Sequence, residues 1–140
     1  MVKKKNKTIA VVINTCFGGF GLSQEAILEL YKMNAPGIKV ETPKEYFGVD
    51  WEEKMADTIK RKAFYGSIIY EGKILADEYD YAHGHLRADP KLVKVVRKMK
   101  DKSWGPYAEL KIVRIPADVK WEVEEYDGME HIAECHKTWS

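Results

Sequence analysis

The pattern of apolar and polar positions predicts a strand followed by a helix at the start of the chain. Residues 8–13 are a β-branched apolar run, which is typical of a buried strand. Residues 23–33 carry apolar side chains at helical spacing, at positions 26, 27, 30 and 31. Ser23 is a suitable N-cap, and the breaker cluster at residues 34–37 predicts the end of this helix.

Two hairpins are predicted by pairs of apolar runs that flank a glycine turn. Residues 67–70 and 73–75 flank Glu71-Gly72, and residues 119–126 and 129–137 flank Asp127-Gly128. A two-residue turn fixes the register of the strands that it joins. In the second hairpin, Val123 is therefore expected opposite Ile132, and Glu125 opposite Glu130.

The remaining segments predict two further helices, a strand and a loop. Residues 51–64 have apolar side chains at four-residue spacing, which favours a helix. Asp89 and Pro90 suit the cap and first turn of a helix that continues to Gly105-Pro106. A strand follows at residues 107–115. Residues 77–86 contain aromatic residues and histidines without a clear period, and are predicted to be a loop.

Together these elements predict an α/β (α+β) fold in a single domain over residues 8–140. We expect a mixed or antiparallel sheet with two main helices and a C-terminal β-hairpin. Residues 1–7, which include four lysines, are predicted to be a basic flexible tail.

Composition narrows the function classes only slightly. The 140-residue chain is 45% hydrophobic and 32% charged, with a formal net charge of +1. These values are ordinary for a globular protein and give no strong nucleic-acid signal. No apolar run approaches the roughly 20 residues that span a bilayer, so no membrane partner is expected. Two cysteines, Cys16 and Cys135, are too few for a disulfide framework, which favours a cytoplasmic setting.

A glycine-rich join links the first strand to the first helix, and residues 14–23 read Asn-Thr-Cys-Phe-Gly-Gly-Phe-Gly-Leu-Ser. Such a turn directs backbone N–H groups and the positive end of the helix dipole toward one place. The join is therefore a candidate site for a phosphate or carboxylate. It lacks the Lys-Ser/Thr ending of a P-loop and the glycine spacing of the dinucleotide motif. The alternative is a tight strand–helix turn with Phe17 and Phe20 in the core.

Charged residues share the predicted core face of the C-terminal hairpin. This face carries Glu125, Glu130, Glu134 and His136 beside its apolar residues. Carboxylates that lie opposite each other destabilise a strand pair, so such a row needs partners. Either the row lies in solvent beyond the core, or it lines a pocket in which its partners are Arg87, Arg114, a lysine or the donors of a bound ligand. Arg87 could itself help a helix N-terminus to hold an anion, or pair with a hairpin glutamate.

Metal binding and covalent chemistry have weaker support. His83 and His85 are closely spaced, but no second pair of ligands accompanies them, so no metal and no cofactor are predicted. Cys16 is the best candidate nucleophile, because a helix N-terminus favours a thiolate and His131 or His136 could act as base. The alternative role for Cys16 is a small buried apolar side chain.

Residues 13–23 resemble the start of a family of small proteins of bacteriophage and prophage genomes. Residues 86–90, 108–116, 121–128 and 136–139 resemble the same family, whereas residues 38–85 do not match it. The resemblance supplies a source and no activity, and it implies that the matching polar residues form one site. With the glycine-rich loop, the candidate ligand site comprises Asn14, Thr15, Phe17, Gly18, Gly19, Phe20, Gly21, Ser23, Arg87, Asp127, Glu130, His136 and Trp139.

The sequence favours a binding module for an anionic, nucleotide-like small molecule, which would sequester a signal in the cytoplasm of a bacterial host. One alternative is an enzyme that acts on such a ligand through Cys16 or through Glu/His acid–base chemistry. Another is a protein-interaction module that blocks a host factor. The sequence is also compatible with a homo-oligomer.

Overall fold

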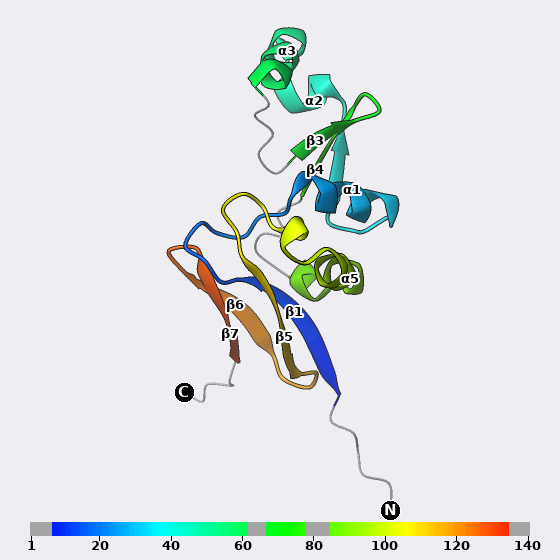
Figure 1. Ribbon diagram of the computed structural model, residues 1–140. Coiled ribbons are helices and arrows are strands. Elements are labelled where there is room, and N and C mark those ends of the chain that lie inside the picture. The colour runs from blue at the N-terminus through cyan, green and yellow to red at the C-terminus, as the bar shows by residue number, and fades with distance from the viewer. Residues whose placement is uncertain (1–6, 62–66, 78–84, 135–140) are drawn as a thin grey trace, which may run out of the picture.

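Residues 7–61, 67–77 and 85–134 are described by the structure, which is a computed structural model. Figure 1 shows one body, formed by the first strand and the C-terminal part of the chain, and a second group of elements formed by the middle of the chain. Predictions for Cys135, His83, His136 and Trp139 lie outside the described residues. In chain order the elements are β1 (Thr8–Asn14), α1 (Gln24–Lys32), β2 (Ile38–Glu41), α2 (Pro43–Phe47), α3 (Trp51–Arg61), β3 (Ser67–Tyr70), β4 (Lys73–Asp77), the 3₁₀ helix η1 (His85–Ala88), α5 (Pro90–Met99), the 3₁₀ helix η2 (Lys100–Ser103), β5 (Leu110–Pro116), β6 (Trp121–Tyr126) and β7 (Met129–Glu134).

Strands β1 and β5 form the antiparallel pair at the centre of the body. Val12 lies opposite Ile112, and Thr8 lies opposite Pro116. The predicted first strand is confirmed, whereas β5 begins three residues later than we expected. The reason is a turn at residues 105–108, closed by a hydrogen bond of 3.1 Å from the Ala108 N–H to the Gly105 carbonyl.

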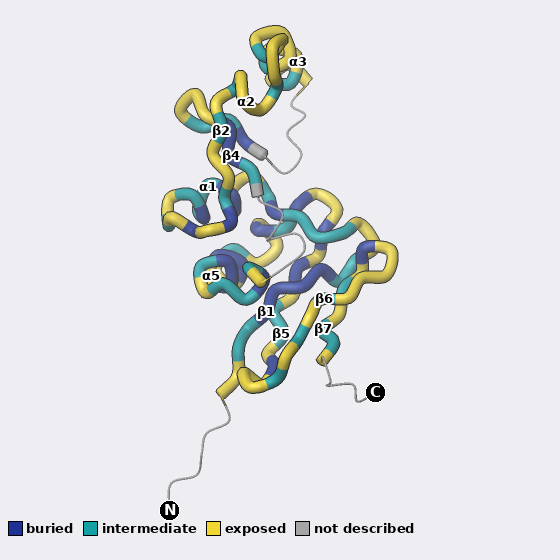
Figure 2. Tube along the Cα trace, turned by 180° about the vertical axis from the view of Figure 1, so that it is seen from behind, coloured by how far each residue is buried: buried dark blue, intermediate teal, exposed yellow. Residues whose placement is uncertain are grey.

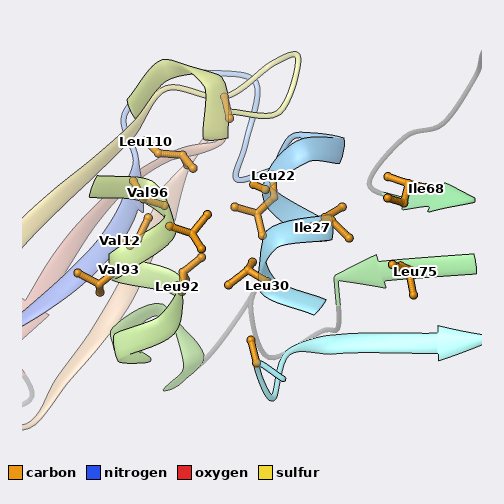
Figure 3. Packing of buried hydrophobic residues seen from close by; sticks show 14 residues of the cluster. Val12, Leu22, Ile27, Leu30, Ile68, Leu75, Leu92, Val93, Val96 and Leu110 are labelled. Atoms are coloured by element: carbon orange, nitrogen blue, oxygen red, sulfur yellow. The ribbon is translucent and has the colours of Figure 1, made fainter. Parts of the chain in front are cut away.

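Helices α1 and α5 bury one face each: α5 packs on β1 and β5, and α1 packs on α5. Both predicted caps are confirmed: the Ser23 hydroxyl accepts a hydrogen bond from Ala26, and the Asp89 carboxylate accepts from the first turn of α5. Leu92 of α5 faces Leu30 of α1 in Figure 3, and Val96 belongs to the same core cluster. Helix α5 ends at Met99, earlier than predicted, because Lys100 has a φ of 55° that no α-helix accommodates.

The C-terminal hairpin β6–β7 has the predicted register. Val123 lies opposite Ile132, and Glu125 lies opposite Glu130. Its apolar face packs on the side of β1 and β5 away from α5, in a second core cluster of Val11, Ile13 and Ile115 with Trp121, Val123 and Ile132. Within the described residues, the hairpin forms a sheet of its own and shares no ladder with β1 or β5.

The middle of the chain forms a third sheet, with strand order β2-β4-β3. The hairpin predicted at Glu71-Gly72 is confirmed, and so is the helix that begins at Trp51, as far as Arg61. Strand β2 and helix α2 were not predicted. The Thr42 and Glu45 side chains form a capping box at the start of α2, a pattern that was available in the sequence. Figure 2 shows that α2 and α3 are largely exposed.

The fold class is mixed α+β with antiparallel sheets, as predicted. The strands divide among three sheets, and α1 connects the body to the β2-β4-β3 sheet: its Ile27 shares one core with Ile68 and Leu75 (Figure 3). Among the described residues, no helix is long and apolar enough to cross a membrane.

Candidate functional site

The glycines of the loop after β1 allow backbone segments to pack closely. A Cβ atom on Gly105 would lie 2.8 Å from the Gly21 carbonyl carbon, and the Gly105 N–H donates to the Gly21 oxygen at 2.8 Å. Gly18 packs so tightly on the backbone of Tyr107 that no Cβ would fit. The loop glycines therefore hold residues 103–109 against the loop.

The two phenylalanines of the loop have different environments. Phe20 is partly buried, and its ring centre lies 3.6 Å from the central carbon of the Arg87 guanidinium. Phe17 is 68% exposed, so the alternative interpretation, which placed both rings in the core, is wrong for Phe17. The backbone of Phe17 packs on Gly128 of the hairpin turn, which leaves its side chain outside.

Asn14, at the end of β1, ties three segments together from a fully buried position. Its side-chain nitrogen donates to the carbonyls of Cys16 and Gly128 at 2.6 and 2.7 Å. Its side-chain oxygen accepts from the Glu109 N–H at 2.9 Å. One side-chain amide thus connects the glycine-rich loop, the hairpin turn and the start of β5. Both its nitrogen and its oxygen are hydrogen-bonded to the backbone, so its role is structural.

Arg87 and Glu130 form a buried, bidentate ion pair. The two guanidinium nitrogens lie 2.6 and 2.7 Å from the two carboxylate oxygens, and the side chains are 0% and 4% exposed. Arg87 also donates to the Val12 carbonyl at 3.1 Å, while Glu130 accepts from the Asn14 N–H at 2.7 Å. These backbone groups point away from β5, so the ion pair satisfies the open edge of β1 as a neighbouring strand would.

This pairing resolves the alternatives for the charged row of the hairpin. The interpretation that Glu130 lies in solvent is wrong, because η1 brings Arg87 beside it. Glu125 and Glu134 are exposed, so for these two residues the alternative that the row lies in solvent holds. The Glu125 carboxylate accepts from the Gly128 N–H at 3.2 Å and so supports the hairpin turn.

Several other predicted site residues have local structural roles. The Thr15 hydroxyl donates to the Glu109 carbonyl at 3.0 Å, and the Ser23 hydroxyl donates to the Lys102 carbonyl at 2.6 Å. Asp127 has a φ of 50°, as the predicted turn requires. Gly128 is buried, and a Cβ there would lie 2.6 Å from the Gly19 nitrogen.

The structure thus brings together Asn14, Gly18, Gly19, Arg87, Gly128 and Glu130, but as a tightly bonded cluster rather than an open cradle. A guanidinium that already holds a carboxylate must give it up before it can bind another anion.

Cys16 is half-buried, and its thiol donates to the Tyr107 carbonyl at 2.8 Å. The hydrogen-bond partners of this thiol in the described structure are oxygen acceptors, and none is a histidine.

No group of three or more His, Cys, Asp or Glu side chains among the described residues could hold a metal ion. His85 is exposed on η1, and the His131 ring lies 3.7 Å from the exposed Glu124 carboxylate.

Sequence reasoning missed a groove between α5 and the β1–β5 pair, called here the cationic groove. Its volume is about 650 Å³. Its lining residues are Ile9, Ala10, Ala88, Pro90, Val93, Lys94, Arg97, Lys98 and Arg114. The signal available in the sequence was the helical spacing of Lys94, Arg97 and Lys98, which places three cations on one side of the predicted helix.

In comparisons with known proteins, no family model, no curated protein and no solved structure matches this chain. The resemblance to phage and prophage proteins therefore stays a prediction.

Proposed function

We propose that the protein is a binding module for a small, anionic, nucleotide-like molecule, and that the cationic groove holds this ligand. One observation carries the proposal: four of the nine lining residues are cationic and none is a carboxylate. The formal net charge of +1 for the whole chain conceals this local excess.

The gathering of these cations has no complete structural explanation. Arg97 and Lys98 lie in the last turn of α5, where they interact favourably with the helix dipole. Arg114 belongs to β5, and its Nε donates to the Thr8 hydroxyl at 3.2 Å. Because like charges repel, a site that converges cations from two elements gains from an anion that neutralises them.

The size and the lining of the groove suit a ligand with a flat or apolar body. Small-molecule sites usually enclose roughly 300–1,000 Å³, and the cationic groove lies within that range. Ala10 and Val93 are among the apolar residues of its lining. A nucleobase against these residues would leave its phosphates beside Arg97 and Arg114.

We assign the anion to the groove rather than to the glycine-rich loop for two reasons. In the loop cluster, the Arg87 guanidinium is bound by Glu130 and is buried. The loop also lies beside the exposed carboxylates of Glu109, Glu125 and Asp127, which repel an anion. The proposed setting, the cytoplasm of a bacterial host where the ligand would be a signal, rests on the phage resemblance and on the low cysteine count.

Isothermal titration calorimetry tests the proposal with nucleoside mono-, di- and triphosphates, and with inorganic phosphate and a fatty acid for comparison. Arg97→Ala and Arg114→Ala should each weaken nucleotide binding by roughly 1.5–3 kcal/mol if the guanidinium contacts a phosphate directly, and by less if it is screened. Arg61→Ala, on the exposed surface of α3, is the matched control.

Three outcomes would contradict the proposal. If no nucleotide binds, the proposal of a nucleotide-like ligand is wrong. If the fatty acid binds more tightly than the nucleotides, the ligand of the groove is a lipid-like anion instead. The third outcome is that neither groove substitution weakens nucleotide binding and the nucleotide changes the NMR chemical shifts of Gly18 and Gly19. The glycine-rich loop would then be the binding site.

A further inference from the structure

Four exposed apolar side chains gather at the end of the molecule where the glycine-rich loop meets the hairpin turn. They are called here the aromatic tip and comprise Phe17, Tyr107, Tyr126 and Met129, which are 68%, 66%, 75% and 37% exposed. Figure 1 shows the blue loop after β1, the yellow loop before β5 and the orange β6–β7 turn meeting at this end. Half of the eight large, exposed hydrophobic residues of the described structure therefore lie in one place.

Close backbone packing fixes the segments that carry the aromatic tip relative to one another. Gly18, next to Phe17, packs on Tyr107 with no space for a Cβ, and Gly128 packs on Phe17 in the same way. Tyr126 and Met129 face each other across the turn that contains Gly128. The buried side chain of Asn14 connects the same segments by hydrogen bonds. A surface that is rigid before binding loses little conformational entropy on association.

Exposed carboxylates neighbour two tyrosines of the aromatic tip along the chain. Glu109, Glu125 and Asp127 are exposed and flank Tyr107 and Tyr126 along the chain. Aromatic rings also attract cations, because the face of each ring is electrically negative. The tip is therefore complementary to lysine and arginine side chains, whereas the cationic groove is complementary to anions.

We infer that the aromatic tip is a docking surface for a basic segment of a partner protein. Tyrosine, phenylalanine and methionine are enriched in protein interfaces, where a few aromatic residues carry most of the binding energy. Because these side chains stand out from the surface, they suit an extended protein segment better than a small molecule, which needs a concave site. This inference does not depend on the cationic groove.

The test uses the complete chain and a short fluorescein-labelled peptide of Lys, Arg and Leu, with fluorescence anisotropy as the readout. A second peptide, in which Glu replaces every Lys and Arg, is the charge control. Tyr126→Ala should weaken binding of the basic peptide about tenfold or more, as expected for an aromatic residue central to an interface. Tyr46→Ala is the matched control, because Tyr46 is an exposed tyrosine on α2, far from the tip.

A second variant tests the charge complementarity. Asp127→Asn removes one negative charge, and asparagine tolerates the positive φ of this position. Binding of the basic peptide should weaken, and its dependence on salt concentration should decrease. Tyr126 and Asp127 are both exposed, so both variants should keep the thermal midpoint of the wild type.

The inference is overturned if the basic peptide does not bind, if the Glu peptide binds equally well, or if Tyr126→Ala and Tyr46→Ala have the same effect. It is also overturned if the wild type forms a dimer in sedimentation experiments that Tyr126→Ala dissociates, since a second copy of the chain then occupies the tip. None of these results changes the expectation for nucleotide binding in the groove.

Discussion

Removal of the Glu130 carboxylate should be among the most destabilising single changes in this protein. Glu130→Ala takes away the carboxylate that contacts the buried Arg87 and the acceptor of the Asn14 N–H. Breaking a buried ion pair from one side costs about 3–5 kcal/mol, and an unsatisfied buried N–H costs about 1–3 kcal/mol. Water that enters the space left by the side chain can solvate Arg87 and the Asn14 N–H, which offsets part of these two costs. We therefore expect Glu130→Ala to lower the free energy of unfolding by about 4 kcal/mol.

Urea denaturation followed by tryptophan fluorescence measures this loss as a change in the free energy of unfolding. Glu130→Gln keeps an acceptor for the Asn14 N–H and loses only the charge, so it should cost less than Glu130→Ala. Glu124→Ala is the control, because Glu124 is on the neighbouring strand and its side chain is 49% exposed. This control should change stability by less than about 0.5 kcal/mol.

A double-mutant cycle separates the ion pair from the packing of its side chains. Arg87→Met and Glu130→Met together replace the pair by apolar groups of similar size, which is often nearly neutral for a buried ion pair. The double variant should therefore be more stable than the sum of the single effects predicts, by at least about 2 kcal/mol. The reasoning is refuted if the single effects add, or if Glu130→Ala is as mild as Glu124→Ala.

Two further predictions concern a turn and a cap. Gly128→Ala should lower the free energy of unfolding by more than Gly72→Ala, because both glycines have positive φ but only Gly128 packs against another backbone, that of Phe17. Gly128→Val should cost still more, and equal thermal midpoints for the Gly128→Ala and Gly72→Ala variants would contradict the close packing. The pKa of Glu45 is lowered, chiefly by its hydrogen bond to the Thr42 backbone and then by the Thr42 side chain. The capping box is therefore present at neutral pH and lost as the pH falls through this lowered pKa. Thr42→Ala should raise the pKa of Glu45 toward its ordinary value in an NMR titration, and an unchanged titration would exclude the side-chain contribution.

Local patterns were sufficient to predict most of the elements of this fold. The turns at Glu71-Gly72 and Asp127-Gly128 fix the register of two hairpins, because positive φ at both central residues leaves little choice of geometry. The caps Ser23 and Asp89 fix the starts of two helices for a similarly local reason. Helix α2 was missed although its capping box is equally local, because a five-residue helix has no apolar period to accompany it.

The contacts of the candidate site depend on packing between distant segments, which a single sequence does not reveal. Arg87 and Glu130 are 43 residues apart, and their pairing was one of several open alternatives. The burial of Glu130 follows from how the hairpin lies against β1, not from its place in the hairpin. Similarly, Arg114 joins Arg97 and Lys98 in one groove only because α5 packs over β5.

The attachment of the hairpin to β1 through side chains has a consequence for partial unfolding. Hairpin β6–β7 shares no ladder with another described strand, so it can separate as one cooperative unit while the β1–β5 pair stays intact. The Asn14 amide proton is held by Glu130 alone at that edge, so its hydrogen-exchange rate reports the separation directly. In the opened state, the bare edge of β1 and the apolar face of the second core cluster are exposed together. That state is the one from which strand exchange between two copies, or aggregation, would begin.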